Sequence, residues 1–147
     1  YDNEKLFLLD CLLHMGYNRN SLVELVLNEF YKRHDNYLWG YADFLYTLKN
    51  YKYMNEYLKI IMDKGYGDNR QMLILLVGKS KSNTVLPYLL KLSADNDDGI
   101  IGHVLIALSN FKDDRIFPIM KKYSNYPKKW IANVAKRYLR KHGVNSI

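Results

Sequence analysis

Residues 97–143 read DDGIIGHVLIALSNFKDDRIFPIMKKYSNYPKKWIANVAKRYLRKHG, and this stretch decides the fold. Apolar residues recur in it at positions i, i+3 and i+4, the spacing of amphipathic helices. This spacing is followed by Trp130, Ile131, Val134, Tyr138 and Leu139 in the last segment, and by Ile116, Phe117, Met120 and Tyr123 in the segment before it. No segment alternates with a period of two for long enough to indicate a strand. The sequence therefore predicts an all-α protein.

The same pattern recurs along the whole chain. Apolar anchors stand at Met15, Leu48, Val77, Leu108 and Leu139, spaced 33, 29, 31 and 31 residues apart. An interval of this length holds two helices and two turns, which is typical of a helical repeat protein. We expect helices at about 3–15, 20–33, 36–49, 52–64, 68–79, 84–93, 98–110, 114–124 and 127–142.

Residues that favour the start of a helix stand at the starts of several expected helices. Ser21 with Glu24 predicts a capping box, and Asp97 predicts an N-cap before an apolar helix. Pro87 and Pro118 would break a helix interior but cost little in a first turn, where the N–H groups lack intrahelical partners.

Residues 97–143 also resemble the short HEAT repeats of phycobilisome-lyase-like and related proteins. Ala135 and Leu139 match the Ala-x-x-x-Leu pair of that pattern, and Asp113, Asp114 and Pro118 match its turn and early proline. The resemblance covers residues 68–143 well and weakens toward the N-terminus. It implies a right-handed α-solenoid of about four HEAT-like helix pairs plus a terminal capping helix, with the second helices on the concave side. It implies no activity, because such arrays serve mostly as binding scaffolds.

Length and composition indicate one globular domain over residues 1–147. Its expected units are 3–33, 36–65, 68–95 and 97–125, with the terminal helix at 127–142. Hydrophobic residues make up 48% and charged residues 25%, an ordinary globular balance. No apolar run approaches the roughly 20 residues that cross a membrane. A single cysteine excludes an internal disulfide, which favours a cytoplasmic protein. The chain opens at Tyr1 without a methionine, as a piece of a longer protein would.

Motifs for catalysis, metals and cofactors are missing. LLVGKS at 75–80 resembles the end of a phosphate-binding loop, but Leu73 stands where the motif needs glycine. DNDDG at 95–99 resembles part of a calcium loop, but Leu105 stands where that loop needs glutamate. The four histidines stand far apart, without a second ligand at metal spacing. We therefore expect no catalytic residue, no metal site and no cofactor.

Aromatic residues are dense in the second predicted pair. Tyrosine and tryptophan are favoured at the centres of interfaces, because each buries a large apolar body and keeps a polar tip. The predicted protein-binding residues are Tyr37, Trp39, Tyr41, Tyr53 and Tyr57. The alternative is that these side chains belong to the core.

Positive charge gathers at the C-terminal end. Residues 115–147 hold nine Lys and Arg and no Asp or Glu. A spacing of 100° per residue places Lys129, Asn133, Lys136 and Arg140 on the face of the last helix opposite its apolar face. The predicted anion-binding residues are Lys121, Lys122, Lys129, Lys136 and Arg140. The alternative is a solvated face that caps the stack.

These features favour a non-catalytic scaffold that binds another protein, one form of which is an immunity-type inhibitor. The alternative is a nucleic-acid-binding protein that uses the basic C-terminal unit, as in the DNA-repair glycosylases built of HEAT-like repeats. A third class, an enzyme of the glycosylase kind, needs a carboxylate in the concave groove, and Asp43 and Glu56 are its candidates.

Overall fold

The computed structural model describes residues 2–35 and 37–143, and within them the chain is all-helical. The α-helices are α1 (Asp2–His14), α2 (Arg19–Lys32), α3 (Leu38–Leu48), α4 (Met54–Met62), α5 (Gln71–Lys79), α6 (Leu86–Leu92), α7 (Asp98–Leu108), α8 (Ile116–Tyr123) and α9 (Lys129–Lys141). Two 3₁₀ segments, η1 (Tyr51–Tyr53) and η2 (Lys64–Arg70), precede α4 and α5. Each predicted helix is confirmed, with ends that differ by a few residues.

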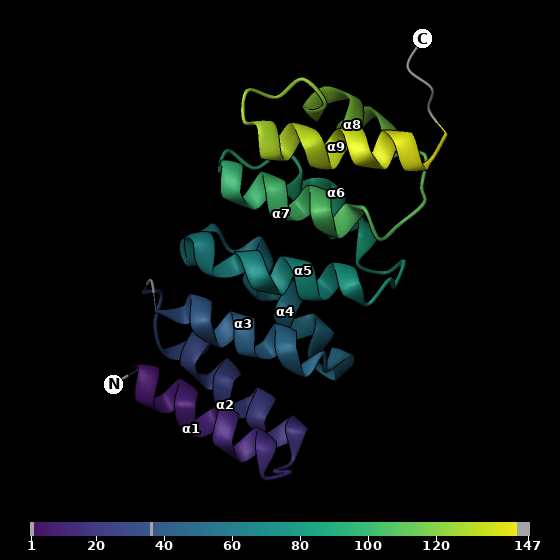
Figure 1. Cartoon of the computed structure of the whole chain (residues 1–147). Helices are drawn as coiled ribbons and strands as arrows, with labels where there is room; N and C mark the ends of the chain where they lie inside the picture. Colours follow the sequence, from purple (N-terminus) through teal and green to yellow (C-terminus); the bar gives the residue numbers. More distant parts are fainter. Residues whose placement is uncertain (1, 36, 144–147) are drawn as a thin grey trace. The chain divides into compact units, whose positions relative to one another are not determined.

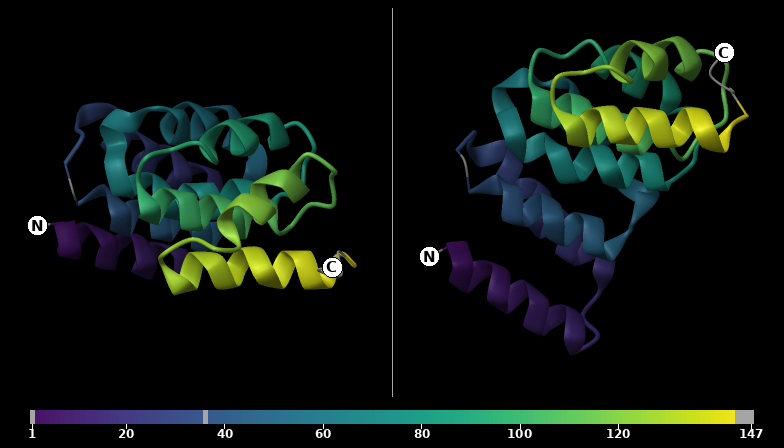
Figure 2. Two further views of the ribbon diagram at one scale, coloured as in Figure 1. Left: turned by 90° about the horizontal axis from the view of Figure 1, so that it is seen from above. Right: turned by 45° about the horizontal axis from the view of Figure 1, so that its top comes forward.

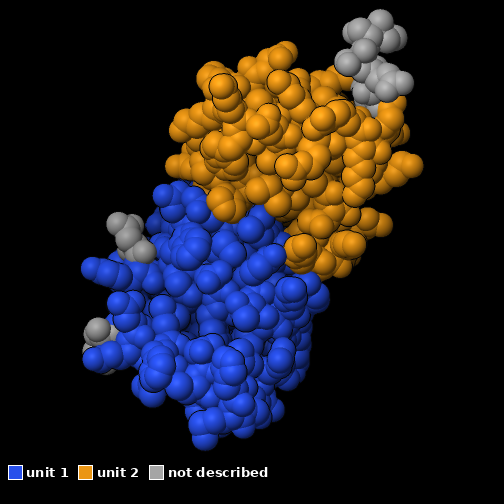
Figure 3. All heavy atoms as spheres, viewed as in Figure 1, with its two compact units in different colours: residues 1–77 blue, residues 78–147 orange. Residues whose placement is uncertain are grey.

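The chain forms two compact units, residues 1–77 and residues 78–147 (Figure 3). The boundary falls inside α5, in the first helix of the predicted pair at 68–95, rather than in a turn between pairs.

Within the first unit, α1 and α3 lie in one layer, and α2 and α4 lie behind them (Figure 1). The buried side chains come mainly from α2, α3, α4 and the part of α5 in this unit, and the core includes Phe30, Leu45, Ile61 and Leu73. η2 contacts both α3 and α4 and buries its own Tyr66, whose hydroxyl donates to the carbonyl of Phe30 at 2.8 Å.

Within the second unit, α7 and α9 form one layer and α6 and α8 the other (Figure 1). α9 contacts both α7 and α8, and α8 and α9 lie side by side in the two views of Figure 2. Leu108, the predicted anchor, is completely buried, as are Val104 and Ile131. Gly78 allows a close approach to α7, because a Cβ there would lie 2.6 Å from the Cβ of Ala107.

Most of the helix caps and first-turn prolines predicted from the sequence are found at helix starts. Asp97 caps α7 by accepting from the N–H of Ile100 at 3.0 Å, and Pro87 stands in the first turn of α6. The predicted capping box is wrong. α2 is capped by Asn18, whose side chain accepts from the N–H of Ser21, so that Ser21 already lies inside the helix.

Candidate binding surfaces

The N-terminal helix α1 has apolar side chains on two opposite faces. Leu9 is buried, and Leu6 packs against α3, where a Cβ at Gly40 would lie 2.7 Å from its Cδ1. On the other side of α1, Phe7 and Leu8 are 67% and 58% exposed. One face of α1 therefore joins the core of the first unit, while Phe7 and Leu8 are exposed among the polar residues of the helix.

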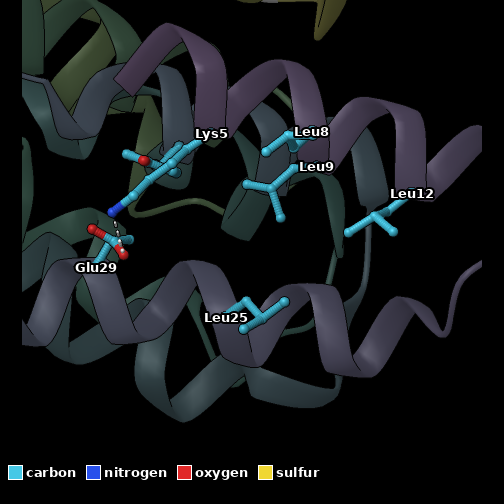
Figure 4. Close-up of a pocket in the computed structure, with 7 residues that line it drawn as sticks. Lys5, Leu8, Leu9, Leu12, Leu25 and Glu29 are labelled. Atoms are coloured by element: carbon cyan, nitrogen blue, oxygen red, sulfur yellow. Dashed lines mark hydrogen bonds and ion pairs between the residues drawn. The ribbon is translucent and has the colours of Figure 1, made fainter. Parts of the chain in front are cut away.

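Leu8 also lines a pocket of about 230 Å³ between α1 and α2 (Figure 4). Leucines from both helices line most of it, and the residues around it are Lys5, Leu8, Leu9, Leu12, Leu25, Glu29 and Tyr41. Lys5 and Glu29 stand at one end of the pocket, with their charged atoms 3.4 Å apart. The pocket thus suits an apolar group, with one ion pair at its edge.

Arg33, just after α2, ties the start of α1 to this part of the unit. Its guanidinium donates to the carboxylate of Asp2 at 2.5 Å and to that of Asp35 at 3.0 Å. The ion pair with Arg33 lowers the pKa of Asp2 below its ordinary value. The guanidinium carbon also lies 5.6 Å from the centre of the Tyr41 ring, so the cation is held by charge and by an aromatic face.

The predicted aromatic patch is only partly on the surface. Tyr37 and Trp39 are 66% and 41% exposed, whereas Tyr41 and Tyr57 are buried at 1% and 0%, so their assignment to an exposed binding surface is wrong. Both buried hydroxyls are satisfied internally, since Tyr57 donates to the carbonyl of Asn50 and Tyr41 donates to Asp2. The patch predicted from aromatic density is thus divided between the core and the surface.

Tyr53, the fifth predicted residue, is half-buried and belongs to a pair of tyrosine–carboxylate contacts between α2 and the η1–α4 segment. Its hydroxyl donates to Glu24 of α2 at 2.6 Å, and Tyr31 of α2 donates to Glu56 of α4. Burial and the bond to Glu56 raise the pKa of Tyr31 to about 12. Neither contact can be read from the sequence, because the paired residues stand 25 and 29 positions apart and leave no local pattern.

Catalytic use of the two candidate carboxylates gains no support. Glu56 accepts from Tyr31 and Lys59, and the Tyr31 bond above all lowers its pKa, whereas a general acid needs a raised one. Asp43 lies on α3, where its backbone carbonyl accepts from the Thr47 hydroxyl. In the part of the chain that the structure describes, no group of three His, Cys, Asp or Glu could hold a metal ion.

Charge differs sharply between the two units. The second unit holds 13 Lys and Arg against 5 Asp, a net charge of +8, and the first holds 9 against 10, a net charge of −1, which together give the +7 of the chain. All five predicted anion-binding residues are exposed in the second unit. Lys129, Lys136 and Arg140 share one face of α9, and Lys121 and Lys122 lie on α8.

The five acids of the second unit stand at residues 95–98 and 113–114, and four of them accept hydrogen bonds there: Asp95, Asp97, Asp98 and Asp113. Asp98, at the start of α7, pairs with Lys128 at 2.8 Å and accepts from Tyr126, and these two contacts lower its pKa. Asp113 binds Arg115 at 2.8 Å, which lowers the pKa of Asp113 to about 2.

The chain matches no protein-family model, and no curated protein or solved structure is significantly similar to it. Among the described residues, no helix has the length and apolar character needed to cross a lipid bilayer.

Proposed function

We propose that this chain is a non-catalytic helical-repeat module that binds another protein, and that the partner docks on the apolar surface of α1 and α2. The observation that carries the proposal is the apolar pocket between these helices, where the lining residues Leu8 and Leu25 are still 58% and 49% exposed. Single exposed apolar residues are ordinary, but an apolar pocket lined by exposed leucines is typical of an interaction site.

The lining of the pocket supports an apolar group of the partner. Leu8, Leu9 and Leu12 of α1 and Leu25 of α2 supply most of it, and Lys5 and Glu29 pair with each other at its edge. An amphipathic helix of a partner, laid along α1 with one apolar side chain in the pocket, would cover Leu8 and Leu25.

We also infer that the helix pairs are short HEAT-like repeats in a right-handed solenoid. The regular spacing of the anchors and the helix–turn–helix units support this, since each pair buries its apolar face only against its neighbours. Binding is the usual role of such arrays. An immunity-type inhibitor is one form that a small binding module of this kind takes.

The test is affinity capture from the source organism, with and without nuclease. The variant replaces Leu8 and Leu25, which line the pocket, by serine, and its matched control replaces Tyr88 and Ile106, which are 41% and 38% exposed in the second unit, by serine. We expect the Leu8/Leu25 variant to lose the captured protein and the control to keep it. All four side chains are exposed, so both variants should fold, as circular dichroism would check.

A photo-cross-linking residue at Leu8 makes the test sharper. It should join the partner to α1, whereas the same residue at Tyr88 should not. Equal capture by the Leu8/Leu25 variant and the unmodified chain would contradict the docking site, and capture that disappears with nuclease would contradict a protein partner.

A further inference from the structure

The exposed face of α9 carries charge of one sign only. Its exposed residues are Lys129, Trp130, Asn133, Lys136, Arg137, Arg140 and Lys141. We propose that this face binds the phosphate backbone of double-stranded nucleic acid. The proposal concerns another surface and another unit than the proposed protein site, and it stands or falls independently of it.

The like charges on α9 repel each other within the helix. Lys136 and Arg140 are four residues apart, as are Arg137 and Lys141, and like charges at this spacing destabilise an isolated helix. Lys129 stands in the first turn, where the helix dipole disfavours a cation. Arg140 and Lys141 are favourably placed in the last turn, so the unfavourable positions are those of Lys129 and the mid-helix cations.

Most acids of the second unit already have partners within it. Asp98 pairs with Lys128 and Asp113 pairs with Arg115, while Asp97 caps α7. Among the described residues, Lys129, Lys136 and Arg140 form no ion pair. Their attraction is therefore available to an anion from outside the chain.

A solvated cap does not account for this face. A cap needs polar side chains, which glutamate and lysine supply equally well, and a surface that mixes both signs also gains favourable i,i+4 pairs. The absence of any acid from residue 115 onward goes beyond what a cap requires.

The geometry favours a duplex over a single strand. At 100° per residue, Lys129, Lys136 and Arg140 fall within about 40° of one another, and eleven residues of helix span roughly 16 Å. Such a straight, rigid row suits the fixed phosphates of a duplex. A single-strand site would instead need freely presented aromatic rings, and Trp130 is packed on α7, where a Cβ at Gly102 would lie 1.8 Å from its Cη2.

The test measures fluorescence anisotropy of a labelled mixed-sequence DNA duplex against the full chain over a range of NaCl concentrations. The variant replaces Lys129, Lys136 and Arg140 by glutamine. We expect several-fold to more than tenfold weaker binding at about 50 mM salt. The slope of log K against log salt should also fall by up to about 0.9 for each lost phosphate contact.

The matched control removes three exposed cations of the first unit, replacing Lys32, Lys52 and Lys64 by glutamine. It changes the net charge equally, so it should leave affinity and slope nearly unchanged if α9 is the site. Equal weakening by the control would overturn the proposal, as would tighter binding of a single strand than of the duplex. It would also be overturned if the unmodified chain left the duplex unbound at about 50 mM salt and bound labelled polyglutamate instead, the result expected for an acidic protein partner.

Discussion

The indole ring of Trp130 on α9 lies directly over Gly102 on α7. A Cβ built at Gly102 would lie 1.8 Å from Cη2 and 2.1 Å from Cζ3 of that ring. Only a residue without a side chain allows the two helices this approach, because an indole cannot bend away as the end of a flexible chain can.

Replacing Gly102 by alanine should therefore destabilise the protein. Alanine gains up to about 1 kcal/mol over glycine in a helix interior, but the forced overlap costs typically 1–3 kcal/mol, so we expect a net loss. Denaturant unfolding followed by circular dichroism measures it. In a Trp130→Ala background the overlap disappears, and the same change at Gly102 should become neutral or stabilising. A loss of equal size in both backgrounds would contradict the packing of Trp130 on Gly102.

Leu108 tests the repeat frame. It is 0% exposed at the anchor of α7, so Leu108→Ala should lower the free energy of unfolding by about 2–5 kcal/mol. Ile106→Ala, on the same helix at a position 38% exposed, is the control and should cost much less. If the change at Leu108 costs less than about 0.5 kcal/mol, the range of surface changes, the frame is misplaced.

The helices could be predicted because each carries its own signals. Periodic apolar residues, Asp97 as a cap and prolines in first turns act within a few residues of each other, and the α-helices of residues 2–35 and 37–143 form where these signals predict them. The start of α5 is a partial exception. The prediction begins at 68, whereas the α-helix begins at Gln71, after a 3₁₀ segment in which Gly67 takes a positive φ of 50°. The sequence does not mark where a 3₁₀ turn gives way to an α-helix.

The surfaces were harder to predict, because burial depends on distant neighbours. Tyr41 and Tyr57 look like Tyr37 in the sequence, and only the packing of α1 and of η1 places the first two inside. The exposed outer face of α1 was missed for the opposite reason, since an apolar segment such as 6–13 normally indicates a core. On α9, by contrast, polar and apolar faces separate cleanly, and the predicted exposure of Lys129, Lys136 and Arg140 is confirmed.

Arg33 should be needed to hold α1 in place. Its side chain is 24% exposed and pairs with Asp2, Asp35 and Glu29, so Arg33→Gln leaves three carboxylates without their shared cation. We expect a loss of about 1–3 kcal/mol, the scale of hydrogen bonds to charged groups, and faster amide hydrogen exchange in α1. Lys32→Gln, an exposed neighbour, is the control. Unchanged exchange in α1 after loss of Arg33 would show that the apolar contacts alone hold the helix.

Stability at alkaline pH should depend on Tyr41. Burial, and next the charge of Asp2, raise the pKa of its hydroxyl from 10.0 to about 12. A raised pKa in the folded state means that the unfolded chain loses this proton first as the pH rises. The stabilisation that comes from this raised pKa is therefore fully present below pH 10 and is lost as the pH rises toward about 12.

Tyr41→Phe should lower the free energy of unfolding near neutral pH, because the hydrogen bond to Asp2 is lost. It should also make the decrease of that free energy above pH 10 less steep. Urea unfolding at a series of alkaline pH values measures both effects, with Tyr88→Phe at an exposed position of α6 as the matched control. If the fall above pH 10 is as steep in Tyr41→Phe as in the unmodified chain, ionisation of this buried hydroxyl contributes nothing to alkaline unfolding.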